Sequence, residues 1–110
     1  MVFFMDQISV TQLKSRLDAG DDIQLIDVRQ ANEHDYARIE GSKLIPMGEI
    51  IGRMDEIDPA REAVVYCHTG MRSARAIQAL EHYGFTGKLS NLVGGIAAWS
   101  DQVDPTVPHY

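Results

Sequence analysis

The chain has 110 residues, of which 45% are hydrophobic and 24% charged, and its net charge at pH 7 is −6. This composition is ordinary for a globular protein, and the length suffices for one domain with its own core, so we expect a single domain over residues 1–110. An acidic chain without a basic stripe is not typical of general nucleic-acid binders, and we expect no nucleic-acid partner.

Cys67 is the only cysteine, so the chain can form no internal disulfide and offers no cysteine pair for a zinc site. A single free thiol fits a reducing compartment. The apolar stretch 2–5 is too short for a signal peptide and lacks a basic lead, and no segment approaches the length of a membrane span. We therefore expect a cytoplasmic protein with no metal ion and no membrane partner.

The first predicted helix begins after Ser9 and ends before Gly20. Ser9 and Gln12 fit a capping box, and the apolar side chains that follow fall on one helical face. Residues 23–28 form an apolar run typical of a central strand, and residues 33–36 fit one short helical turn.

The rest of the chain alternates between short apolar runs and helical spacing. The runs predict strands at 43–45, 64–67 and 88–92. Helical spacing is found at 47–57, 73–83 and 96–99, and residues 104–110 are expected to form a short C-terminal tail. Strands that alternate with helices predict an α/β fold, with a mainly parallel central sheet and helices on both of its faces.

Cys67 lies where a predicted strand meets a polar turn that contains Gly70 and leads into the next helix. Backbone N–H groups in such a turn, together with the helix N-terminus, form an anion site that lowers the pKa of a thiol. Arg72, five residues on, can return over the loop and hold a small anion. The alternative is a buried structural cysteine, but the order of Gly, Arg and Ser after Cys67 favours a nucleophile.

Several short patterns occur together along this chain. They are LIDVR at 25–29, Glu33, Ile39, Gly41, Ile45 with Pro46, CHTGMRS at 67–73, GGI at 94–96, and Trp99. In combination they resemble a rhodanese-like sulfurtransferase domain, from about Ile8 to the end of the sequence. The resemblance implies the three-layer α/β fold of that family.

The resemblance also assigns roles to residues. It implies that Cys67 forms a persulfide and that Arg72 is the second catalytic residue. It further implies a substrate cradle built from His68, Thr69, Gly70, Met71 and Ser73, with Asp27 and Arg29 as structural support. The sulfur donor would be thiosulfate or a persulfide donor protein, and because the persulfide itself carries the sulfur, no cofactor is expected.

Loop length separates two reactions found on this fold. Related cell-cycle phosphatases and arsenate reductases have a C-x-x-x-x-x-R loop around a tetrahedral oxyanion, whereas Cys67 and Arg72 are separated by four residues. A smaller ring of amides suits one extra sulfur atom, and no aspartate beside the loop is placed to act as a general acid. Sulfur transfer is therefore favoured, and a phosphatase or arsenate reductase relative remains the second alternative.

Other features concern the subgroup and the neighbouring side chains. Residues 37–42 read ARIEGS where many relatives have G-H-I-x-G-A, and the ending at 104–110 is similar to rhodanese domains appended to adenylyltransferases. That similarity implies a ubiquitin-like sulfur-carrier protein as a possible partner. His68 is expected to point outward rather than act as a base, and His34, His82 and His109 are expected at the surface. The first alternative function is a non-catalytic, sulfur-sensing or protein-interaction module.

Overall fold

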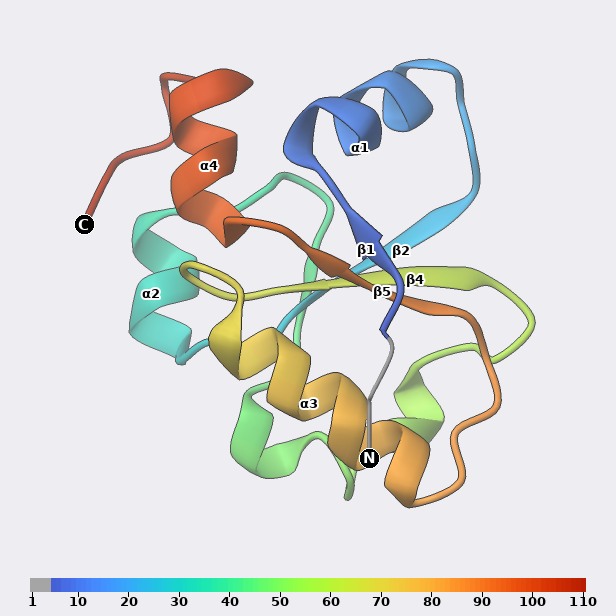
Figure 1. Cartoon of the computed structure of the whole chain (residues 1–110). Coiled ribbons are helices and arrows are strands. Elements are labelled where there is room, and N and C mark those ends of the chain that lie inside the picture. Colours follow the sequence, from blue (N-terminus) through green and yellow to red (C-terminus); the bar gives the residue numbers. More distant parts are fainter. Residues whose placement is uncertain (1–4) are drawn as a thin grey trace.

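Five strands form one fully parallel sheet in the spatial order β1-β5-β4-β2-β3 (Figure 1). The computed structural model describes residues 5–110, and the apolar residues 2–4 lie outside the described part. The strands are β1 (Gln7–Ile8), β2 (Ile23–Asp27), β3 (Lys43–Leu44), β4 (Glu62–Tyr66) and β5 (Leu89–Leu92). The helices are α1 (Val10–Asp18), α2 (Ala31–Tyr36), α3 (Met71–His82) and α4 (Gly95–Gln102), with the 3-10 turns η1 (Met47–Glu49) and η2 (Met54–Glu56).

The sheet is the middle of three layers. Helices α1 and α4 contact each other over one face, whereas α3 packs against β4, β5 and η1 on the other (Figure 1). Side chains of a strand alternate between faces, so Val64 and Tyr66 of β4 point to the α1–α4 side, and Val65 points to the α3 side together with Cys67. The predicted α/β fold, with helices on both faces of a parallel sheet, is confirmed.

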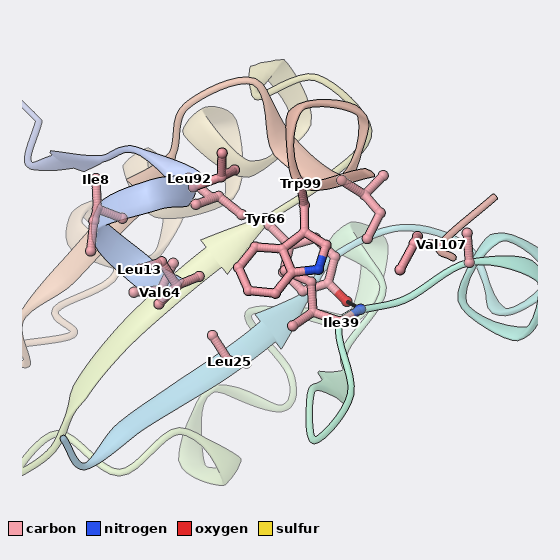
Figure 2. Close-up of a cluster of buried hydrophobic side chains, with 12 residues drawn as sticks. Ile8, Leu13, Leu25, Ile39, Val64, Tyr66, Leu92, Trp99 and Val107 are labelled. Carbon is pink, nitrogen blue, oxygen red and sulfur yellow. Dashed lines mark hydrogen bonds between the residues drawn. The ribbon is translucent and has the colours of Figure 1, made fainter. Parts of the chain in front are cut away.

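Each face of the sheet has its own hydrophobic core. Figure 2 shows the core on the α1–α4 side, where Trp99 of α4 and Leu13 of α1 pack with Val64 and Tyr66 of the sheet. Burial of an aliphatic side chain of this size contributes roughly 1.5–3 kcal/mol. The two cores therefore fix the sheet from both sides and leave its carboxyl edge for the polar residues described below.

The predicted first helix has the expected start. The Ser9 hydroxyl accepts from the Gln12 N–H at 3.1 Å, and the Gln12 side chain accepts from the Ser9 N–H at 2.9 Å. The helix after the cysteine loop ends as predicted near Gly84, which has φ +93°. That helix begins at Met71, two residues before the predicted start.

Two parts of the secondary-structure prediction were wrong. Strand β1 was missed because two residues are too few to show a period, although they pair with β5. The helical spacing at 47–57 corresponds to the two separate 3-10 turns η1 and η2. Ile50 and Ile57 are still buried against the α3 side, so the apolar positions were read correctly while the type of helix was not.

Residues 104–110 are not a loose tail. Val107 is buried in the core on the α1–α4 side, and its carbonyl oxygen accepts from the Ser100 hydroxyl. The segment then runs back from α4 towards α2 (Figure 1). The ring of Tyr110 meets the ring of Tyr36 of α2 edge-on. The final residues therefore reach the edge of the sheet where Cys67 lies. None of the helices in residues 5–110 is long and apolar enough to cross a membrane.

Candidate active site around Cys67

The carboxyl ends of β2 and β4 lie side by side, because Asp27 pairs with Tyr66 in the parallel register. Cys67 follows Tyr66 directly, and Arg29 follows Asp27 by two residues. Asp27, Arg29 and Cys67 therefore meet at one edge of the sheet. This is the edge at which open α/β sheets usually bind ligands.

Helix α4 closes onto the beginning of the cysteine loop. The Ile96 N–H donates to the Cys67 carbonyl oxygen at 2.9 Å, and the Ala97 N–H donates to the His68 carbonyl oxygen at 3.1 Å. A side chain at Gly95, whose φ is +57°, would place its Cβ 2.5 Å from both of these oxygens. Only glycine permits this approach, which explains why a glycine stands at this position of the GGI pattern.

The loop surrounds the Cys67 sulfur with hydrogen-bond donors. The Gly70 N–H donates to the sulfur at 3.1 Å, and the Ser73 hydroxyl lies 3.3 Å from it. Gly70 has φ +117°, in the left-handed region that favours glycine, and α3 begins at the next residue, Met71. The sulfur therefore lies next to the first turn of a helix, where main-chain N–H groups have no partner within the helix.

This environment lowers the pKa of the Cys67 thiol below its ordinary value. Burial acts in the opposite direction, because it disfavours the thiolate. Hydrogen bonds from the Ser73 side chain and from the N–H groups of Ser73, Gly70 and Thr69 outweigh burial. The donor set is the one expected for an activated thiol rather than for an inert buried cysteine.

Asn91 of β5 supports the loop, and the sequence prediction missed it. Its side-chain N–H donates to the Gly70 carbonyl oxygen at 3.1 Å, and its carbonyl oxygen lies 2.5 Å from the Ser73 hydroxyl. Asn91 is buried, with an exposed fraction of 7%. A buried amide in a predicted strand is the one signal that could have identified it, since such a group needs polar partners.

Arg72, which was predicted to return over the loop, is paired with Glu33 of α2. Its two terminal nitrogens donate to the two Glu33 carboxylate oxygens at 2.8 and 2.9 Å. The bond from Arg72 lowers the pKa of Glu33 to about 2, so this carboxylate stays ionised near neutral pH. The hydrogen bonds to Glu33 likewise raise the pKa of Arg72.

Asp27 and Arg29 form a fully buried ion pair beside the loop. The Arg29 Nε and Nη2 atoms donate to the two Asp27 carboxylate oxygens at 2.9 and 2.7 Å, and Nη2 also donates to the Ala37 carbonyl oxygen. The expectation that His34 lies at the surface was wrong, because its Nδ1 atom is 2.8 Å from Asp27 and its side chain is only 15% exposed. Buried charges need such partners, and these residues brace the neighbouring strand end.

Tyr110 brings the C-terminal segment into the same cluster. Its ring stacks on the His68 ring with centroids 4.2 Å apart and an angle of 14° between planes. Its hydroxyl lies 2.7 Å from Arg29 Nη1 and 2.7 Å from Glu33 Oε2. Within the described part of the chain no hydrogen bond joins the imidazole of His68 to Cys67.

The predicted cradle residues differ in their exposure. Thr69 is exposed and Met71 is 69% exposed, so both lie at the rim, whereas Ser73 is buried and Cys67 has an exposed fraction of 1%. A hollow of about 50 Å³ is lined by His68, the start of α4 and the C-terminal segment. A larger hollow of about 480 Å³ lies at the opposite end of β4, where Glu62 is paired with Arg16 and Lys88.

Nothing in residues 5–110 resembles a metal centre, since no three His, Cys, Asp or Glu side chains come together there. His82 is exposed, and His109, which is also exposed, lies 3.3 Å from Asp101. Arg75 is exposed one helical turn after Arg72.

Comparison with known proteins places these features in a family. The sequence model of the family described as Rhodanese-like domain matches residues 9–102. The chain is 39% identical over 108 residues to MoeZ of Mycobacterium tuberculosis, named as a probable adenylyltransferase/sulfurtransferase; the match covers 94% of this chain and 26% of MoeZ. This chain thus spans about a quarter of the length of that relative.

Two further matches extend over most of both chains. A protein named sulfurtransferase from Allochromatium vinosum is 36% identical over 103 residues, with 94% of this chain and 95% of that protein covered. The crystal structure of a rhodanese-like domain protein from Staphylococcus aureus superimposes with a TM-score of 0.81 at 31% identity, over 90% of this chain and 95% of that one. Together with the match over residues 9–102, they establish that the chain belongs to the rhodanese-like domain family.

Proposed function

We propose that this protein is a rhodanese-type sulfurtransferase that carries a sulfane sulfur as a persulfide on Cys67. The observation that carries the proposal is the pair of polar contacts on the Cys67 sulfur: the Gly70 N–H donates to it at 3.1 Å, and the Ser73 hydroxyl lies 3.3 Å from it. Relatives that are named sulfurtransferases support the same reaction class. Donors fixed before the reaction stabilise a sulfur anion without the cost of reorganisation.

The reaction has two steps that balance. With thiosulfate as donor, the Cys67 thiolate attacks the outer sulfur, a new S–S bond forms, and the old S–S bond breaks so that sulfite leaves with the electron pair. A nucleophilic acceptor then attacks the outer sulfur of the persulfide, and the Cys67 thiolate leaves with the electron pair of that S–S bond. With cyanide as acceptor the product is thiocyanate.

Access to the thiol requires movement of the loop, because Cys67 is only 1% exposed. Residues 68–71 form the rim of the loop, in which Thr69 and Met71 are exposed and His68 is partly buried. Displacement of this segment admits the donor, and Arg72 at the edge of the loop orients an anionic donor. A persulfide on a donor protein is the second donor class that this site suits.

The similarity to MoeZ supports one class of acceptor. MoeZ is named as an adenylyltransferase and a sulfurtransferase, and this chain corresponds to about a quarter of it. We therefore propose a ubiquitin-like sulfur-carrier protein as a physiological acceptor, supplied with sulfur in trans by the Cys67 persulfide.

A phosphatase reaction is disfavoured by the same geometry. The loop between Cys67 and Arg72 has four intervening residues, and the carboxylate bound to Arg72 belongs to Glu33, whose pKa is about 2. A carboxyl group that is ionised near neutral pH cannot donate a proton to a leaving group. Hydrolysis of an aryl phosphate that depends on Cys67 would overturn this choice.

Mass spectrometry tests the proposal directly. After incubation with thiosulfate and removal of the excess, we expect the intact protein to gain the mass of one sulfur atom on the peptide that contains Cys67, and to lose it when cyanide is added. The Cys67→Ser variant is the matched control and should show neither change. A wild-type protein that folds but gains no sulfur from thiosulfate or from a persulfide donor would support a non-catalytic module instead.

A further inference from the structure

Tyr110 is the one side chain of the C-terminal segment that joins the two ion pairs of the site. One pair, Asp27–Arg29, is fully buried, and the other, Glu33–Arg72, lies at the edge of the cysteine loop. The Tyr110 hydroxyl is 2.7 Å from Arg29 and 2.7 Å from Glu33, so it lies between the two pairs.

The direction of both hydrogen bonds is fixed by chemistry. An arginine guanidinium can only donate, so the Tyr110 oxygen accepts from Arg29. The Glu33 carboxylate is ionised and can only accept, so the Tyr110 hydroxyl donates to Glu33. The phenol uses its single proton for Glu33 and one lone pair for Arg29, so one hydroxyl satisfies both partners.

The Glu33 carboxylate is held on every side. One oxygen accepts from Arg72 Nη1 and from the Gln30 N–H, and the other accepts from Arg72 Nη2 and from the Tyr110 hydroxyl. Removal of the Tyr110 hydroxyl leaves the second oxygen with Arg72 alone. The carboxylate then rotates more freely, and the guanidinium that it orients is less well defined.

The ring of Tyr110 is located independently of its hydroxyl. It stacks on His68 at 4.2 Å, and the Tyr36 ring meets it edge-on at 6.1 Å. A phenylalanine at this position therefore keeps the ring contacts and loses only the two hydrogen bonds, which makes the role of the hydroxyl accessible to experiment.

We propose that Tyr110 is a positioning residue for the donor-binding step, because its hydroxyl bridges Arg29 and Glu33 and thereby orients Arg72 in the first turn of α3, where the Cys67 loop ends. The role of Arg72 as a ligand for an anionic donor belongs to the proposed function, on which this inference rests. Tyr110 acts through Glu33 and makes no contact with the reacting sulfur.

The test compares Tyr110→Phe with Tyr83→Phe, a matched loss of a hydroxyl from an exposed tyrosine at the end of α3. Two readouts are used on the full chain. The first is the ratio of alkylation rates of Cys67 by iodoacetate and by iodoacetamide, which differ in charge. The second is the set of kcat and KM values for thiosulfate in thiocyanate formation from cyanide.

In Tyr110→Phe we expect the rate ratio to fall, and the KM for thiosulfate to rise, by about three- to tenfold, the loss that one net hydrogen bond produces. The rate with neutral iodoacetamide and kcat should change by less than about twofold, as for loss of a binding contact rather than of reactivity. Tyr83→Phe should match the wild type. In the Glu33→Gln background the Tyr110 substitution should have no further effect on the ratio, because its path to Arg72 is already broken.

Two results would overturn the inference: an unchanged rate ratio in Tyr110→Phe, or an effect of equal size with and without Glu33→Gln. A lower melting temperature with an unchanged ratio would assign Tyr110 to stability alone. The alkylation ratio does not depend on sulfur transfer, so a ratio that falls in a protein without sulfurtransferase activity would reject the proposed function and keep the positioning role.

Discussion

Replacement of Ser73 by alanine tests whether side-chain hydrogen bonding activates the Cys67 thiol. The Ser73 hydroxyl lies 3.3 Å from the sulfur, and the Asn91 side-chain oxygen at 2.5 Å and the Gly70 carbonyl oxygen at 3.2 Å compete with the sulfur for its one proton. A net hydrogen bond contributes about 0.5–1.5 kcal/mol, and we take about 1 kcal/mol for this one. That free energy corresponds to about a fivefold lower thiolate fraction at pH values below the pKa.

The assay is the rate of Cys67 alkylation by iodoacetamide as a function of pH. Ser73→Ala should react about fivefold more slowly on the acidic side. The two proteins should converge on the alkaline side, because both are then fully ionised. Ser90→Ala, which removes a hydroxyl from a buried serine of β5, is the control and should follow the wild-type profile. Identical profiles for Ser73→Ala and wild type would refute the reasoning, because the main-chain donors alone would then account for the lowered pKa.

Three other predictions concern the residues that hold the loop. Gly95→Ala should lower the free energy of unfolding, measured with denaturant, clearly more than Gly20→Ala does. At Gly20 only the left-handed penalty of about 1–2 kcal/mol applies, since a Cβ there meets nothing within 4 Å. Equal losses of unfolding free energy would contradict the close approach of α4 to the cysteine loop. Glu33, with its pKa lowered from 4.5 to about 2, should contribute stability that is complete above about pH 4.5 and is lost as the pH falls towards 2. We expect about 1–2 kcal/mol after allowance for the partly exposed Arg72, and urea unfolding of wild type and Glu33→Gln at both ends of this range measures it. Asn91→Ala should destabilise the protein by about 1–3 kcal/mol and slow alkylation of the thiol, because polar groups of the loop lose their partner; unfolding and alkylation rates that match the wild type would exclude this support.

The sheet could be predicted from the sequence because its central strands are mainly apolar segments and the helices beside them show helical spacing of apolar residues. Strands β2 and β4 are mainly apolar, and α1 begins with a complete capping box. The weak points are segments in which long-range contacts decide the structure. Strand β1 has only two residues, and it exists because β5 offers a free edge. Residues 104–110 show neither helical nor strand spacing of apolar residues, yet Val107 is buried in the core.

In the candidate site, too, local features could be predicted from the sequence and long-range contacts could not. Residues close to Cys67 in sequence were predicted, since a strand, a tight turn and a helix N-terminus follow one another there. Partners supplied from elsewhere were not, because nothing local indicates that Glu33 lies opposite Arg72 or that Asn91 lies under the loop. Tyr110 is the clearest case: its hydroxyl spans 81 residues in sequence to reach Arg29, and only the folded chain brings the two together.

The charged side chains around Cys67 are paired with one another rather than with the thiol. Arg29 is neutralised by Asp27, and Arg72 is neutralised by Glu33, so neither arginine supplies a full uncompensated charge to the sulfur. The Gly70 N–H, in contrast, donates directly to the sulfur at 3.1 Å, and a donor that is already in place stabilises an anion without reorganisation. The ion pairs instead hold the two strand ends and α2 in register around the loop. In this site the side-chain ion pairs position the loop, and the Ser73 hydroxyl together with the loop N–H groups lowers the pKa of the Cys67 thiol.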